Sequence, residues 1–80
     1  MKADGFDEAI LGVGYRCGQD EILVYDRDKC IHILVKDGMS YEEAVEYFEF
    51  NVEGAWIGEL TPMFVQRYNN LEDILDAYAE

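Results

Sequence analysis

The side chains best suited to metal binding or nucleophilic chemistry are two cysteines and one histidine, Cys17, Cys30 and His32. A structural zinc site needs about four ligands at characteristic spacings, and residues two apart on a helix do not share a face. The three residues therefore do not predict a metal site. We expect both thiols to be buried and reduced, and His32 to lie in solvent. A small ligand- or metal-binding enzyme subunit is an alternative that would depend on these residues.

Two short stretches resemble ligand-binding loops without meeting their requirements. GVGYRCG, residues 12–18, is close to the dinucleotide fingerprint G-x-G-x-x-G, but its third glycine comes one residue late. DRDKCIHILVKD, residues 26–37, has Ile31 where a calcium-binding loop needs glycine. With no other catalytic motif and a single histidine, the sequence predicts a protein that is not an enzyme and holds no cofactor or metal.

The chain is long enough for one small domain, residues 1–80. At 9.2 kDa, a compact fold would still expose roughly 5,000 Å² of surface. The chain can therefore bury only a modest core, and we expect a partner chain to add to its stability. The pattern of apolar residues predicts an α+β fold that is mainly helical. We expect about four short helices with one or two short strands, near residues 21–25 and 61–65.

The net charge is −12, and it is unevenly distributed. From residue 37 to residue 66 the chain has seven acidic residues and no basic one. Binding to phosphates requires clustered lysine and arginine, so we expect no direct binding to nucleic acid and none to membranes. A basic partner would be attracted instead. The chain also lacks a long apolar run and the pattern of a secretory signal, which predicts a cytoplasmic protein.

The first element is ambiguous between a helix and a strand. After Asp4, a candidate N-cap, apolar residues recur at helical spacing, which predicts a helix over residues 6–17. Gly12 and Gly14 each disfavour that helix by about 1 kcal/mol relative to alanine. A strand over residues 9–15 is therefore the alternative.

The next elements carry clearer signals. The run EILVYD, residues 21–26, predicts a short buried strand, and Asp26 then caps a second helix that ends near Gly38. A third helix begins at Ser40, which forms an S-x-x-E capping box with Glu43.

The last third of the chain predicts a strand and a fourth helix. Residues 55–65 are expected to be extended, with Met63–Val65 pairing with the strand over Ile22–Tyr25. Asn69 or Asn70 then caps the last helix. That helix has an apolar stripe made by Leu71, Ile74, Leu75 and Tyr78.

The third helix presents acids and aromatic rings on its outer side, a surface that we call the acidic face. It consists of Glu42, Glu46, Tyr47, Glu49, Phe50 and Glu53. On a helical wheel the four glutamates fall within a narrow arc, and no basic residue nearby in the sequence neutralises them. Phe50 lies nearly opposite the core side of the helix. The repulsion costs about 1 kcal/mol, which a folded domain tolerates, so a merely solvated face is the alternative. An aromatic ring surrounded by charge is typical of a binding surface, and Trp56 is a candidate extension of it.

The run from residue 25 to residue 62 contains YDRDKCIHIL and GMSYEEAVEYFEFNVEGAWIGELTP. It resembles a family of small acidic proteins of tailed bacteriophages, over most of the chain. No chemistry is known for the family motif, so the resemblance implies no functional residues. It implies a setting, which is a phage product acting in the cytoplasm of a bacterial host. Small acidic phage proteins often inhibit nucleic-acid enzymes or defence systems such as CRISPR effectors, sometimes by imitating DNA.

These features give a leading hypothesis and two alternatives. The leading hypothesis is a non-enzymatic, phage-type inhibitor whose acidic face binds a basic surface on a host nucleic-acid-binding or defence protein. It would be anti-CRISPR-like, and its carboxylates, one about every 5 Å, approach the charge density of a nucleic-acid strand, about one per 3.4 Å. The first alternative is a homo-oligomeric structural or assembly protein, in which a homodimer buries Phe50. The second is the enzyme subunit described above.

Overall fold

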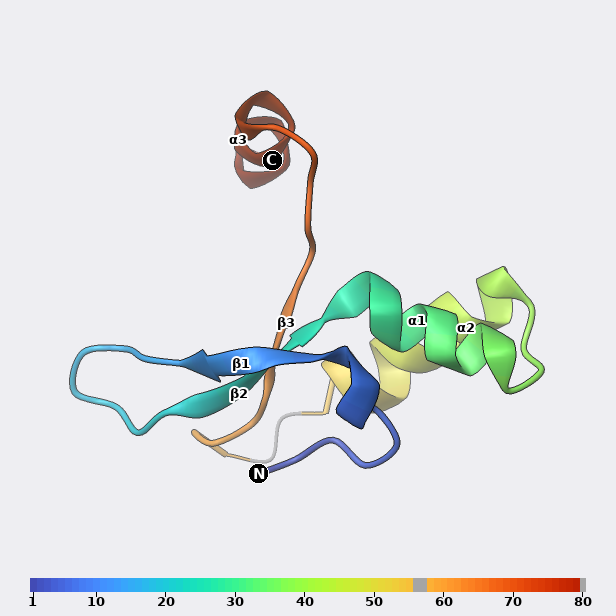
Figure 1. Cartoon of the computed structure of the whole chain (residues 1–80), viewed down its shortest axis with the longest axis horizontal. Coiled ribbons are helices and arrows are strands. Elements are labelled where there is room, and N and C mark those ends of the chain that lie inside the picture. The colour runs from blue at the N-terminus through green and yellow to red at the C-terminus, as the bar shows by residue number, and fades with distance from the viewer. Residues whose placement is uncertain (56–57, 80) are drawn as a thin grey trace.

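The computed structural model describes residues 1–55 and 58–79 and has an α+β fold (Figure 1). The described elements are the 3₁₀ turn η1 (Asp7–Ala9), β1 (Ile10–Gly14), β2 (Ile22–Asp26), α1 (Arg27–Lys36), α2 (Tyr41–Phe48), the π-helical segment η2 (Glu49–Glu53), β3 (Met63–Val65) and α3 (Leu71–Tyr78). The strands form one sheet in the order β1-β2-β3, with β1 antiparallel and β3 parallel to β2. The predicted α+β class is confirmed, as are the strands near residues 21–25 and 61–65, whereas the described residues form three α-helices and three strands instead of about four and one or two.

The predicted helix over residues 6–17 is wrong, and the alternative strand is correct. Residues 10–14 form β1, in which Val13 lies opposite Leu23 and Gly14 opposite Ile22. The sheet needs glycine at this point, because a Cβ on Gly14 would lie 2.9 Å from Cγ2 of Val24. Only the 3₁₀ turn before β1 is helical. The glycines that weaken a helix are therefore compatible with this strand.

The signals for α1 and α2 are confirmed by hydrogen bonds at the helix ends. The side chain of Asp26 accepts a hydrogen bond from the Lys29 amide, and Gly38 follows α1 with a φ of 115° that favours glycine. At the start of α2, the Ser40 hydroxyl accepts from the Glu43 amide while the Glu43 carboxylate accepts from the Ser40 amide. Hydrogen bonding to Ser40 lowers the pKa of the Glu43 carboxyl. The capping box is therefore formed as predicted.

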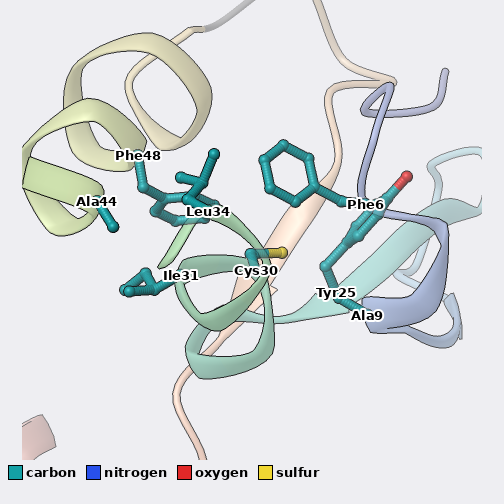
Figure 2. Close-up of a cluster of buried hydrophobic side chains, with 8 residues drawn as sticks. All are labelled: Phe6, Ala9, Tyr25, Cys30, Ile31, Leu34, Ala44 and Phe48. Carbon is teal, nitrogen blue, oxygen red and sulfur yellow. The ribbon is translucent and has the colours of Figure 1, made fainter. Parts of the chain in front are cut away.

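The core lies between α1, α2 and one face of the sheet, with the N-terminal segment closing one side. It contains Phe6, Ala9, Tyr25, Cys30, Ile31, Leu34, Ala44 and Phe48 (Figure 2). The Phe48 ring packs edge-on against Phe6 and Phe64, with ring centroids 6.2 and 5.0 Å apart. The Tyr25 hydroxyl accepts a hydrogen bond from the Ala3 amide at 2.9 Å, which fastens the N-terminal segment over the sheet.

β3 and α3 complete the described chain. β3 pairs with the end of β2, where Val24 lies opposite Met63 and Asp26 opposite Val65. The predicted pairing of these two segments is therefore confirmed. Asn70 caps α3 by accepting a hydrogen bond from the Asp73 amide at 2.9 Å. α3 stands apart from the sheet and the other helices, joined to them by one extended segment (Figure 1). Every described residue of α3 is exposed.

Candidate functional site

The acidic face is built on α2 and on η2, the π-helical segment that continues it. The amide of Gly54 bonds to the carbonyl of Glu49 at 3.0 Å, five residues back, instead of four. Such a widened turn changes which residues share a side. Glu49 and Glu53, in the second half of the acidic face, nevertheless lie close enough together for one arginine to contact both carboxylates.

Arg27, the first residue of α1, lies against that second half. Its Nη2 is 3.0 Å from Oε2 of Glu49, and its Nε donates to Oε2 of Glu53 at 2.8 Å. Its guanidinium lies 5.7 Å from the centroid of the Phe48 ring, and Nη1 donates to Oε1 of Gln66 at 3.4 Å. The expectation that no basic residue neutralises the glutamates is therefore wrong for Glu49 and Glu53.

The environment keeps Arg27 charged. Burial acts to lower the pKa of its guanidinium, but the hydrogen bond and charge of Glu53, with the charges of Glu49 and Asp28, outweigh burial and raise the pKa. Only a fifth of the Arg27 side chain is exposed, against about half of Glu49. The arginine thus joins the start of α1 to η2 and to the segment after β3.

The first half of the acidic face points into solvent. Glu42 and Glu46 are exposed, and neither has an ion pair among the described contacts. Glu46 borders two open, shallow depressions, one reaching to Met39 and the other to Tyr41. These two carboxylates are therefore available to a partner.

The aromatic rings of the acidic face lie outside the core, as expected. The Phe50 side chain is 77% exposed, and Tyr47, three residues earlier, is 43% exposed. Phe50 follows Tyr47 by three residues and Glu46 by four, which are neighbouring positions on a helix, and Glu46 and Tyr47 line the same depression. The proposed extension, Trp56, falls outside the described residues.

The cysteines and the histidine occupy separate environments. Cys30 is buried in the core, whereas Cys17 is exposed, so the prediction of two buried thiols is wrong for Cys17. His32 is exposed on α1, as predicted. No group of three or more His, Cys, Asp or Glu side chains among the described residues is arranged to hold a metal ion.

Arg27 and Gln66 belong to this site although their sequence context gave no signal for it. Arg27 is 22 and 26 residues from the glutamates it binds, and Gln66 Nε2 in turn donates to Oδ2 of Asp28 at 2.8 Å. Helical periodicity indicates only which residues of one helix share a side of that helix. Contacts between elements so distant in sequence become visible only once the elements are placed.

Comparison with family models, with curated proteins and with solved structures gives no match for this chain. Among residues 1–55 and 58–79, no helix has the length and apolar character required to cross a membrane.

Replacing Arg27 with methionine is expected to lower the free energy of unfolding by about 1–2 kcal/mol. Methionine keeps much of the apolar stem but loses both ion pairs and the contact of the cation with the Phe48 ring. Urea unfolding followed by circular dichroism measures the loss. The matched control is Arg67→Met, because Arg67 is 67% exposed and makes a single 3.6 Å ion pair, with Asp26. Equal losses in the two variants would contradict the role of Arg27.

Proposed function

We propose that this protein is a non-enzymatic interaction protein that blocks a basic site on another protein through its acidic face. The observation that carries the proposal is the exposure of Phe50 beside unpaired carboxylates on a structured helix. A buried aromatic anchor with surrounding charges is the usual composition of a binding hot spot. Here Phe50 and Tyr47 would supply apolar contact, and Glu42 and Glu46 would supply the charge.

The charge of the surface favours a basic partner. The net charge of −12, to which the free carboxylates of Glu42 and Glu46 contribute, steers basic proteins toward the molecule and repels nucleic acid. Glu49 and Glu53 contribute less, since Arg27 already binds them. A partner arginine would have to displace Arg27 to use them. Imitation of a continuous nucleic-acid strand is therefore supported less than docking at a compact basic site.

The resemblance to small proteins of tailed bacteriophages gives the proposal its setting. We infer that the target is a bacterial host protein in the cytoplasm, of the nucleic-acid-binding or defence class, whose basic groove normally accepts DNA or RNA. Such grooves carry clustered arginine and lysine, which complement the acidic face. The protein would act by occupying the groove, without an enzymatic step.

The test is capture of a basic partner from a bacterial lysate, followed by binding measurements on the purified pair at several salt concentrations. We expect the double variant Glu42→Lys, Glu46→Lys to weaken binding by at least about tenfold, and Phe50→Ala by a similar factor. The matched control is Glu72→Lys with Asp76→Lys, which makes the same change in net charge on α3. Equal weakening by both double variants would show that only net charge matters and would overturn the proposed face.

A further inference from the structure

α3 has an apolar side that nothing in the described structure covers. Its four apolar stripe residues, Leu71, Ile74, Leu75 and Tyr78, are between 44% and 89% exposed. The opposite side carries acids, so the helix is strongly amphipathic. An eight-residue helix is marginal in water by itself and normally gains its stability from packing of its apolar side. α3 therefore requires a surface to pack on.

The sheet has a complementary surface on the side away from the core. Paired residues share a face of a sheet, and the register places Gly12, Gly14, Ile22, Val24 and Met63 together on one face. None of these residues belongs to the core or packs against it. The two glycines bring no side chain from β1 to this face, where Ile22 and Val24 are partly exposed and Met63 is 47% exposed. This part of the outer face is thus apolar, and no described helix or strand packs over it; the same register places Val65 and Asp26, which pairs with Arg67, at the end of the face.

The chain exposes more surface than a compact monomer of its mass. The chain exposes 6119 Å², whereas a compact monomer of its mass exposes about 5,000 Å². The excess of about 1,100 Å² exceeds the roughly 800 Å² that each partner buries in a stable protein–protein interface. The radius of gyration is 13.4 Å, against about 11.6 Å for a compact chain of this length.

Contacts after β3 direct α3 away from its own sheet. Gln66 is held by Asp28, at 2.8 Å, and by Arg27, at 3.4 Å. Arg67 forms its ion pair with Asp26 at 3.6 Å. These contacts fasten the connecting segment along the start of α1, so the chain leaves the sheet and α3 projects outward (Figure 1). The outer sheet face is then open to another molecule.

We propose that two copies of this chain form a dimer by exchanging α3, with the apolar stripe of each α3 packing on the outer sheet face of the other copy. The exchange uses the same two surfaces twice, so it satisfies twofold symmetry and closes without further growth. It covers the apolar surface of both copies at once. The acidic face lies on α2 and η2 and takes no part in the exchange.

The test is sedimentation equilibrium of the full chain and of single variants, across concentrations up to about 100 µM. We expect a mass twice that of the 9.2 kDa chain. Leu75→Glu on α3 and Met63→Lys on the sheet should each raise the dissociation constant by about 100-fold or more, since each charge is buried twice per dimer. Both side chains are about half exposed, so each variant should still fold, which circular dichroism checks. The matched controls are Asp76→Asn, opposite the stripe, and Phe50→Ala, which should leave dimerisation unchanged.

Four results would overturn the exchange. A full chain that stays monomeric at the highest concentration shows that α3 finds no partner copy. A dimer that resists either Leu75→Glu or Met63→Lys does not join these two surfaces, and one that Phe50→Ala dissociates uses the acidic face instead. Disulfide trapping gives an independent check in a Cys17→Ser background, where a Leu75→Cys chain should cross-link to a Met63→Cys chain. Preferential cross-linking of Leu75→Cys chains to each other would indicate helix–helix pairing and also contradict the proposal.

Discussion

Replacing Phe48 with alanine is expected to lower the free energy of unfolding by about 3–5 kcal/mol. The side chain has no exposed surface, and its ring contacts Phe6 and Phe64 edge-on and lies under the guanidinium of Arg27. It therefore joins α2 to the N-terminal segment, to β3 and to α1. Among residues 1–55 and 58–79, no other core side chain contacts so many elements through its ring. A domain of 80 residues is typically stable by roughly 4–12 kcal/mol, so the variant should lose at least about a quarter of its stability.

Urea unfolding of the variant and the parent protein measures this loss, and the chain offers a close control. Phe50→Ala is the same chemical change two residues later, at a ring that is 77% exposed, and it should change stability by no more than about 0.5 kcal/mol. A Phe48→Ala protein as stable as Phe50→Ala would contradict the placement of these two rings on opposite sides of the helix.

The helix starts could be predicted from the sequence because their stabilising contacts are local. Asp26 bonds to the amide of Lys29, Ser40 to that of Glu43, and Asn70 to that of Asp73, each three residues away. Such pairs are formed by the helix end itself, whatever the rest of the fold does. The sequence therefore predicts α1, α2 and α3 at the correct positions.

The helix predicted for the first segment is wrong because the conformation of this segment depends on a strand that is distant in the sequence. Phe6 and Ala9 are buried, as the helical pattern predicts, but a single 3₁₀ turn is enough to bury both. Beyond that turn, Val13 is half exposed and Cys17 is exposed, so the helical spacing of apolar residues over residues 6–17 is fortuitous. Pairing with β2 decides the conformation of residues 10–14, and helical periodicity contains no information on that pairing.

The acidic face shows the same limit. The exposure of Phe50 follows from its position on the helix, and the sequence predicts it correctly. The neutralisation of Glu49 and Glu53 by Arg27 does not follow, because it requires α1 and η2 to be adjacent in space. Under the proposed function, reversing Glu42 and Glu46, and not the whole row, therefore distinguishes a specific basic partner from general attraction.

The stability contributed by Cys30 is expected to decline above about pH 9. Burial, and secondarily the charge of Asp26, raises the pKa of the Cys30 thiol to about 12, whereas an unfolded chain ionises the thiol near pH 8.5. Between these values the unfolded state releases a proton that the folded state retains. Rising pH therefore favours unfolding through this group, by on the order of 1 kcal/mol per pH unit at most. Below about pH 8 both states hold the proton, and the contribution is complete.

The comparison of the parent protein with Cys30→Ala isolates this effect, because the tyrosines and lysines that also ionise are common to both. The advantage of the parent over Cys30→Ala in urea unfolding should shrink from about pH 8.5 to pH 10.5. Cys17→Ala, at an exposed thiol, is the matched control. The same burial predicts that a thiol reagent at pH 8 labels Cys17 in the folded protein and reaches Cys30 only after denaturation. Figure 2 shows Cys30 enclosed between α1 and the sheet. This enclosure would be contradicted if the stability difference between the parent and Cys30→Ala stayed constant with pH and both thiols were labelled rapidly.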